Sequence, residues 1–264
     1  MKRIIFCDID GTLIDGFRGM KDISDKTVYA LNQLKNDSYV ILTSGRAKCM
    51  LPKKLSEFVP DGYILSNGAY IQCGSTILRS HLFADDQVQF IIDYSKKTDG
   101  RFVLVNQESL FTDQPDDHMV KELLDNLGIQ PSLLSELKEI EQYHFMIEIC
   151  CDEEQCSLFP EVCSDQFSIK RQYTYTAFDV NRLGDTKGDA VMKVINWFKI
   201  DPGSSYCFGD SENDLEMMQL TAHSTAMGNA SKQIQKIADT VTDDVLDDGF
   251  YNELVRQKLI QQMQ

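Results

Sequence analysis

Short apolar runs recur in the first and last parts of the chain, and each ends in a polar or glycine-containing loop. Runs of this kind are typical of buried strands. The predicted strands are residues 4–6, 39–42, 63–65, 205–208 and 224–227. Between them, helical spacing predicts a helix from the N-cap Ser24 to about residue 36, and others at 47–58, 185–198, 215–220 and 245–257. Strands and helices that alternate in this way predict a parallel sheet with crossover helices.

The pattern changes in the middle of the chain. A hairpin is expected at 70–72 and 76–78, and then helices mix with strands that look antiparallel. The helices are expected at 85–97, 117–127 and 152–162, and the strands at 102–106, 144–150, 167–172 and 174–180. We therefore expect one doubly wound α/β domain, residues 1–81 and 183–264, divided by an inserted α+β domain of residues 82–182.

Composition narrows the class of protein. The 264 residues are 42% hydrophobic and 25% charged, which is a globular balance. The net charge of −15 argues against nucleic acid as a partner, because a phosphate backbone needs a basic surface. No apolar run is long enough to predict a transmembrane helix, and the N-terminus has no signal-peptide pattern, so we expect a cytoplasmic protein without a membrane partner.

The eight cysteines show no CxxC pair, and the four histidines are scattered. Free and mostly buried thiols are therefore expected, rather than disulfides or a zinc site.

Asp8 and Asp10 follow the first strand directly, with Gly11 and Thr12 after them. Two carboxylates this close repel each other unless a cation neutralises them, and oxygen ligands suit Mg²⁺. Asp8 is a candidate nucleophile toward a phosphoryl group, and Asp10 a candidate proton donor and acceptor. Thr12 is expected to support the loop by hydrogen bonding. The alternative is a turn that only terminates the strand.

Three further polar groups follow predicted strands or open predicted helices. Ser44 can bind a phosphate oxygen or simply cap the next helix, and Arg46 can contact substrate or form a structural ion pair. Lys187, in the first turn of a helix, is placed unfavourably for the helix dipole but can neutralise a phosphoryl group. A third group supplies oxygen ligands for Mg²⁺ or caps a helix; its members are Asp210, Asn213 and Asp214.

As a set, these motifs resemble those of the haloacid dehalogenase (HAD) superfamily, and more closely its Cof-type branch, subfamily IIB. The matching segments are 8–12 (Asp-Ile-Asp-Gly-Thr), 44–46 (Ser-Gly-Arg), 187–188 (Lys-Gly) and 209–214 (Gly-Asp-Ser-Glu-Asn-Asp). Ser44 stands where the family more usually has threonine. The resemblance covers the whole chain, including the length of the insertion.

The resemblance implies a Rossmann-like core with an inserted C2B-type cap domain, and Mg²⁺-dependent phosphomonoester hydrolysis through an aspartyl-phosphate. The implied catalytic residues are Asp8, Asp10, Ser44 and Lys187. The implied metal contacts are Asp8, the backbone carbonyl of Asp10, and Asp210, supported by Asn213 and Asp214. The implied phosphate- and substrate-binding residues are Gly11, Thr12, Ser44, Gly45, Arg46, Asn67, Lys187 and Asn213.

The expected partner is a small phosphorylated metabolite, with sugar phosphates first and phosphorylated cofactors such as FMN or pyridoxal phosphate next. Two alternatives stay open. One is a phosphomutase that returns the phosphoryl group to a sugar, and the other is a regulatory protein that binds a metabolite without turnover. Either a monomer or a homodimer is compatible with the sequence.

Overall fold

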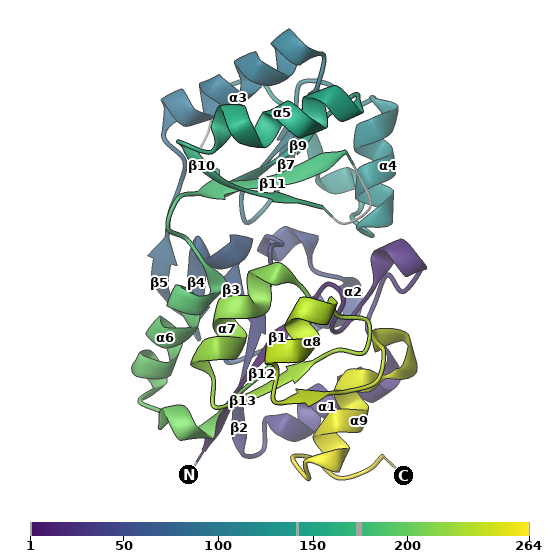
Figure 1. Ribbon diagram of the computed structural model, residues 1–264, viewed down its shortest axis with the longest axis vertical. Helices are drawn as coiled ribbons and strands as arrows, with labels where there is room; N and C mark the ends of the chain where they lie inside the picture. The colour runs from purple at the N-terminus through teal and green to yellow at the C-terminus, as the bar shows by residue number, and fades with distance from the viewer. Residues whose placement is uncertain (1, 141–142, 173–175, 264) are drawn as a thin grey trace.

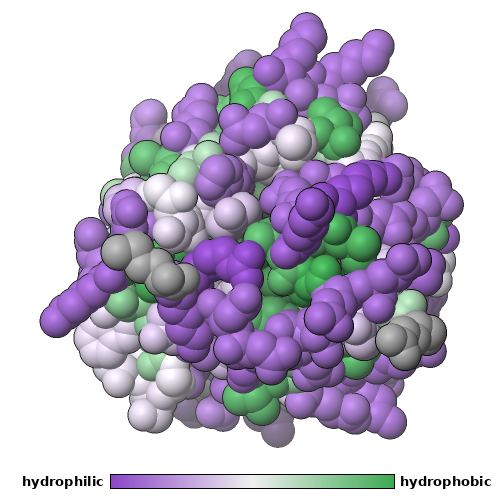
Figure 2. All heavy atoms as spheres, turned by 90° about the horizontal axis from the view of Figure 1, so that it is seen from below, coloured by the Kyte–Doolittle hydropathy of each residue, from purple (hydrophilic) through white to green (hydrophobic). Residues whose placement is uncertain are grey.

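The protein folds around two β-sheets, one above the other in Figure 1. The computed structural model describes residues 2–140, 143–172 and 176–263. The chain begins in the larger sheet, passes into the smaller one and returns, so that both termini lie at the far end of the larger sheet. Figure 2 looks onto that end and shows a largely hydrophilic surface with smaller hydrophobic patches.

The larger sheet has eight strands in the order β14-β13-β12-β1-β2-β3-β4-β5. Its strands are β1 (Arg3–Asp8), β2 (Ser38–Thr43), β3 (Gly62–Leu65), β4 (Tyr70–Cys73), β5 (Thr76–Ser80), β12 (Ser205–Gly209), β13 (His223–Ala226) and β14 (Thr240–Val241). Neighbours from β14 to β3 pair in parallel, and β4 and β5 form the predicted antiparallel hairpin at one edge. The predicted α/β fold with a parallel sheet is confirmed.

Strand β1 is the centre of this sheet. Four successive residues, Ile4 to Cys7, are fully buried, as a parallel strand covered on both faces requires. From β1 the chain moves outward through β2 and β3, and after its return it moves the other way through β12, β13 and β14. The strand order therefore reverses at β1, and ligands of such sheets bind at the carboxyl ends of the strands beside that reversal.

Helices flank the larger sheet. They are α1 (Asp25–Leu34), α2 (Lys53–Glu57), α6 (Lys187–Phe198), α7 (Leu215–Leu220), α8 (Lys232–Ile237) and α9 (Gly249–Arg256). The predicted N-cap of α1 is present, because the Ser24 hydroxyl accepts a hydrogen bond from the Thr27 amide at 3.1 Å. None of the helices within the described ranges is long and apolar enough to span a membrane.

The smaller sheet has six strands in the order β10-β11-β9-β6-β7-β8. Its strands are β6 (Arg101–Val105), β7 (Leu110–Thr112), β8 (Leu134–Glu136), β9 (Phe145–Ile149), β10 (Phe167–Arg171) and β11 (Ala177–Arg182). The accompanying helices are α3 (Asp85–Thr98), α4 (His118–Asn126) and α5 (Glu153–Cys163). In Figure 1, α3 and α5 cover the face that points away from the larger sheet. The domain boundaries at 82 and 183 stay a prediction.

Each sheet has its own hydrophobic core. Two residues of the loop after β2, Ala47 and Met50, pack into the core of the smaller sheet although they precede it in the chain by many residues. The same loop is bound to Gln107, whose side chain accepts from the Lys48 amide at 2.9 Å and whose carbonyl accepts from the Cys49 amide at 3.1 Å. The loop that carries Ser44 to Arg46 is thus anchored in both halves of the molecule.

Some predicted elements differ in the structure. The helix expected at 47–58 is two short helical segments, Lys48–Met50 and α2, because the residue before Pro52 is extended. The last helix is interrupted at Asp248, which has a positive φ of 58°. The expected strand at 174–180 begins at residues that lie outside the described ones. Among the described residues, three short strands and one short α-helix were not predicted: β7, β8, β14 and α8.

All eight cysteines are free thiols, and six of them are buried.

Glu148, on β9, is fully buried in the smaller sheet. The Ser95 hydroxyl donates to Oε2 of Glu148, while Oε1 has no hydrogen-bond partner in the part of the chain that the structure describes. Burial raises the pKa of Glu148 to about 8. The native state therefore holds this proton at pH values at which the unfolded chain, with a pKa near 4.5, has released it.

We predict that Glu148→Gln becomes more stable relative to the wild type as the pH rises from 5 to 8. Over that window the native wild-type protein binds more protons than the unfolded chain. The contribution of Glu148 to the free energy of unfolding therefore falls by about 1 kcal/mol for each unit by which the pH rises. Urea unfolding at pH 5, 6.5 and 8 measures the difference, and Glu161→Gln, an exposed change on α5, is the control. A stability difference between Glu148→Gln and wild type that is the same at all three pH values would contradict the prediction.

Candidate active site

The predicted site residues of the larger sheet meet at the carboxyl ends of its strands. Asp8 ends β1, Ser44 follows β2, Ser66 follows β3 and Asp210 follows β12. Parallel pairing of these strands in register brings their ends to the same edge, with Asp8 opposite Thr43. Segments that are far apart in the sequence therefore form one polar site beside the central strand.

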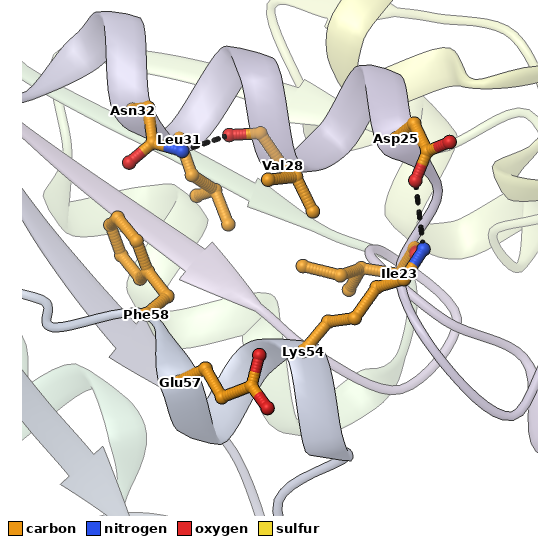
Figure 3. A pocket seen from close by; sticks show the side chains of 8 residues that line it. All are labelled: Ile23, Asp25, Val28, Leu31, Asn32, Lys54, Glu57 and Phe58. Atoms are coloured by element: carbon orange, nitrogen blue, oxygen red, sulfur yellow. Dashed lines mark hydrogen bonds and ion pairs between the residues drawn. The ribbon is translucent and has the colours of Figure 1, made fainter.

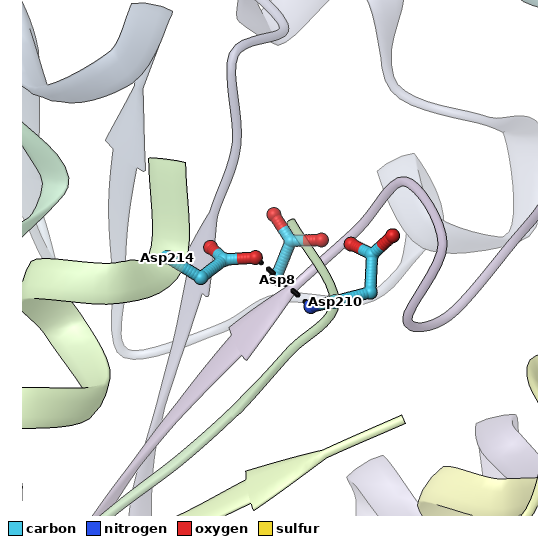
Figure 4. Close-up of side chains that lie close together, drawn as sticks. All are labelled: Asp8, Asp210 and Asp214. Carbon is cyan, nitrogen blue, oxygen red and sulfur yellow. Dashed lines mark hydrogen bonds between the residues drawn. The ribbon is translucent and has the colours of Figure 1, made fainter. Parts of the chain in front are cut away.

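Three carboxylates lie together in this site (Figure 4). Asp8, Asp210 and Asp214 each place an oxygen within 4.8 Å of the others. Asp8 Oδ2 and Asp210 Oδ1 are buried and have no hydrogen-bond partner among the described residues. Burial, followed by the charge of Asp214, raises the pKa of Asp8 to about 8, and burial also raises that of Asp210 well above its usual range. Buried carboxylate oxygens without partners fit a hard divalent cation such as Mg²⁺.

Asp214 differs from the other two because its oxygens are already bound. Its Oδ2 accepts from the amides of Asp210 and Ser211 at 3.0 and 3.2 Å. Its Oδ1 lies 2.7 Å from Lys187 Nζ. Asp214 thus stands behind the cluster and holds the loop after β12, whereas Asp8 and Asp210 keep an oxygen free for a cation.

Lys187 is the first residue of α6, and Thr186 caps that helix by accepting from the Asp189 amide at 3.2 Å. Its side chain is fully buried, and Nζ lies 2.5 Å from Asp8 Oδ1 as well as against Asp214. Burial alone lowers the pKa of a lysine, but the two carboxylates outweigh it and hold the pKa of Lys187 above its ordinary value. The ammonium is therefore charged and fixed beside Asp8.

Arg46 forms the ion pair that the sequence left open. Its Nε lies 2.8 Å from Asp10 Oδ2 and its Nη2 lies 2.7 Å from Oδ1, while Nη1 donates to the Met50 carbonyl at 2.8 Å. The Ser44 oxygen accepts from the Arg46 amide at 3.0 Å, so the Ser44 hydroxyl proton stays available to another acceptor. The guanidinium is buried, and it orients the half-exposed Asp10 side chain.

Asn67 connects three segments. Its backbone has a positive φ of 53°, in a tight turn between β3 and β4. Its Oδ1 accepts from Asn213 Nδ2 at 3.1 Å, and its Nδ2 donates to Asn181 Oδ1 at 3.5 Å. Asn213 thus contacts Asn67 and also accepts from the Ser211 hydroxyl at 2.6 Å. The hydrogen bond to Asn67 thus holds Asn213 at the site.

Gly11 needs to be glycine for two reasons. Its φ is +80°, and a Cβ on it would lie 2.1 Å from Asp210 Oδ2. Its carbonyl accepts from Asn229 Nδ2 at 2.8 Å.

The expected supporting hydrogen bond from Thr12 is absent among the described residues, because the Thr12 hydroxyl is buried without a partner.

Sequence reasoning missed three residues of this site: Asn181, Asn229 and Asp179. Asp179 and Asn181 lie two apart on β11, whose period-two alternation gives a polar face that was a usable signal. Asn229 follows β13 in a glycine-containing loop, and this is the same signal that identified the other strand ends.

A separate pocket lies between α1 and α2 (Figure 3). It is lined by Ile23, Asp25, Val28, Leu31, Asn32, Lys54, Glu57 and Phe58. An ion pair of 2.8 Å between Lys54 and Asp25 lies at its rim. None of the predicted site residues lines this pocket.

Comparisons with known proteins agree with this site. A model of the haloacid dehalogenase-like hydrolase family matches residues 5–254. YkrA of Bacillus subtilis (strain 168), a candidate phosphatase, is 28% identical over 253 residues, with 94% of each chain covered. The HMP-PP phosphatase of Yersinia pseudotuberculosis serotype IB (strain PB1/+) is 27% identical over 247 residues, or 89% of this chain and 87% of that protein.

A solved HAD subclass IIB sugar phosphatase is similar in structure, with a TM-score of 0.82 and 26% identity over 98% of this chain and 100% of that one. The family match spans almost the whole chain, and it includes all the segments on which the resemblance was based. The chain therefore belongs to the haloacid dehalogenase-like hydrolase family, and the expected class of enzyme, a phosphoric monoester hydrolase, is confirmed.

Proposed function

We propose that the protein is a Mg²⁺-dependent phosphatase that hydrolyses small phosphorylated metabolites through an aspartyl-phosphate on Asp8, with Asp10 as the general acid and base. One observation carries the proposal: Asp8 has one oxygen bound to the Lys187 ammonium, and its other oxygen is buried beside Asp210 without a partner among the residues that the structure describes. A carboxylate held in this way is oriented to attack a phosphorus atom.

In the first step an oxygen of Asp8 forms a bond to phosphorus, and the bond from phosphorus to the leaving oxygen breaks. Asp10 gives its proton to that leaving oxygen. In the second step a water molecule attacks the phosphorus, Asp10 takes a proton from it, and the bond to Asp8 breaks. The products are the free alcohol and inorganic phosphate, and both aspartates return to their starting state.

The surrounding residues hold the charges that these steps need. Lys187 neutralises Asp8 and the phosphoryl oxygens, and the Ser44 hydroxyl donates to one of these oxygens. Arg46, anchored on Met50, holds the carboxylate of Asp10 in place.

Asp8, Asp210 and the backbone carbonyl of Asp10 would hold the cation, and Asp214 and Asn213 would support these ligands. When bound there, Mg²⁺ neutralises the carboxylates and the charge that develops on the phosphoryl group.

The named activities of relatives support a small phosphorylated substrate. One relative is an HMP-PP phosphatase and another a sugar phosphatase, so phosphorylated cofactors and sugar phosphates are both candidate classes. The smaller sheet, placed over the site, would act as the cap domain that closes on the substrate.

We predict that Asp8→Asn lowers phosphate release from p-nitrophenyl phosphate by about 10³-fold or more, because an amide is a poor nucleophile. Release by the wild type is expected to need Mg²⁺ and to stop with EDTA. Asp165→Asn, the same chemical change at an exposed position in the turn between α5 and β10, is the control. Unchanged activity in Asp8→Asn would exclude the mechanism, and a sugar phosphate isomerised without free phosphate would indicate the phosphomutase.

We also predict that Gly11→Ala raises the Mg²⁺ concentration for half-maximal activity by about 10- to 100-fold, because the new methyl group displaces Asp210. Gly19→Ala is the matched control, since Gly19 has a φ of +90° but no atom within 4 Å of the added Cβ. Both variants lose about 1 kcal/mol of stability to backbone strain. An equal change in Mg²⁺ dependence in both would show that strain alone is responsible.

A further inference from the structure

Arg79, on β5, carries a nearly buried positive charge that the two proposed reaction steps do not use. Its side chain is only 8% exposed, although β5 is an edge strand of the larger sheet and lies beside α6 (Figure 1). Nη1 donates to the Gly68 carbonyl at 3.1 Å and lies 3.8 Å from Asp185 Oδ1, while Nη2 contacts Asp189 Oδ2. A guanidinium this far from water needs such partners, because burial without them costs free energy.

The two carboxylates lie on either side of Lys187 in the sequence. Asp185 precedes it by two residues, before α6 begins, and Asp189 follows it by two residues, in the first turn of that helix. One guanidinium therefore holds the chain on both sides of the lysine whose ammonium contacts Asp8. Because the Lys187 side chain is buried and close-packed, it has little freedom to compensate for a shift of its backbone.

The third partner of Arg79 belongs to another segment of the site. Gly68 directly follows Asn67 in the loop after β3. A Cβ on Gly68 would lie 2.4 Å from the carbonyl oxygen of Thr186, so this loop and the N-cap residue of α6 are in direct backbone contact. Arg79 spans that contact, with Nη1 on the loop and Nη2 on the helix. It therefore joins the loop that carries Asn67 to the turn that carries Lys187.

Asp185 depends on Arg79 more than an exposed carboxylate would. Its side chain is only 4% exposed. His81 Nδ1 lies 2.7 Å from its Oδ1, and its Oδ2 has no partner within the described ranges. Without Arg79 this carboxylate would lose a neighbouring cation while it stayed out of water, and it would be driven toward solvent. Since Asp185 is two residues from Lys187, that movement would carry the start of α6 with it.

We propose that Arg79 is a positioning residue for the phosphatase reaction. By binding both carboxylates and the Gly68 carbonyl, its guanidinium fixes the first turn of α6 and keeps the Lys187 ammonium against Asp8. Arg79 contacts none of the reacting atoms and acts through Lys187. This inference rests on the proposed function, because the reaction is what requires the ammonium at that place.

The test measures kcat for p-nitrophenyl phosphate and the inhibition constant of inorganic phosphate, both with Mg²⁺ at pH 7.5. In Arg79→Gln, kcat is expected to fall about 10-fold or more and the inhibition constant to rise about 10-fold, because a displaced ammonium binds phosphoryl oxygens less well. The inhibition constant does not depend on how much of the protein is folded, so a purely structural loss would leave it unchanged. Arg79→Lys keeps the charge but cannot reach three acceptors at once, and both of its constants should lie between those of the wild type and Arg79→Gln.

Arg101→Gln is the matched control. Arg101, on β6, is 15% exposed and, like Arg79, contacts two aspartates, but these are Asp99 and Asp117 in the inserted part of the chain. The variant should leave kcat and the inhibition constant as they are in the wild type.

A double-mutant cycle measures whether Arg79 acts through Lys187. Lys187→Met is expected to lower kcat/KM steeply. Adding Arg79→Gln to it should lower kcat/KM by less than about 2-fold more, because the group that Arg79 positions is then already missing. Losses that multiply in the double variant would overturn the proposal.

An Arg79→Gln variant with both constants unchanged, or with a lower kcat and an unchanged inhibition constant, would overturn it too. If that variant does not fold, Asp189→Asn takes its place, since it removes an exposed partner and leaves the buried charges paired. Shifts of about 3-fold in the same directions then support the proposal, and unchanged constants overturn it. Failure of the proposed function is distinct: the wild type would then give no phosphate release that depends on Asp8.

Discussion

The site depends on one buried cation. The Lys187 ammonium lies between Asp8 and Asp214 with no exposure to solvent, and its positive charge opposes the mutual repulsion of the carboxylates gathered there. Removing one member of such a group leaves an uncompensated buried charge, which typically costs about 3–5 kcal/mol. The same contact connects the start of α6 to the end of β1 and to the loop after β12, so one group of ion pairs both orients the catalytic side chains and joins elements of the larger domain.

The doubly wound topology explains why residues so far apart in sequence reach one another. Because β1 lies where the strand order reverses, loops from both halves of the sheet open beside Asp8. The insertion leaves this arrangement intact, because the chain departs after β5 and returns at α6, whose first residue is Lys187. A large unit can therefore be added over the site without disturbing the strands that build it.

Much of this could be predicted from the sequence, for physical reasons. Strands such as β1 and β12 are continuous apolar runs, since both faces of a parallel sheet are covered, and polar residues at their ends stand out. The helix predicted at 47–58 was wrong although a local signal was present, because a residue that precedes proline, here Pro52, avoids the helical conformation. Short edge strands such as β8 and β14 bury too few residues to give a pattern. The partner of Arg46 could not be predicted, because Asp10 is distant in sequence and only the folded loops decide which carboxylate it meets. Asp179 was missed because alternation shows that a strand has two faces without showing which one meets the active site.

The loop after β2 limits how freely the smaller sheet could be replaced by that of another protein. It begins with Ser44 and Arg46 at the active site, and within a few residues Ala47 and Met50 are buried in the core of the smaller sheet, with Gln107 fastening the backbone. A chimera with the smaller sheet of another protein would keep every residue of the larger sheet, yet it would leave this loop without its packing partners. The boundary between the two hydrophobic cores therefore does not coincide with the two points where the chain passes from one sheet to the other. A chimera that exchanges the inserted unit would also have to exchange residues 47–50.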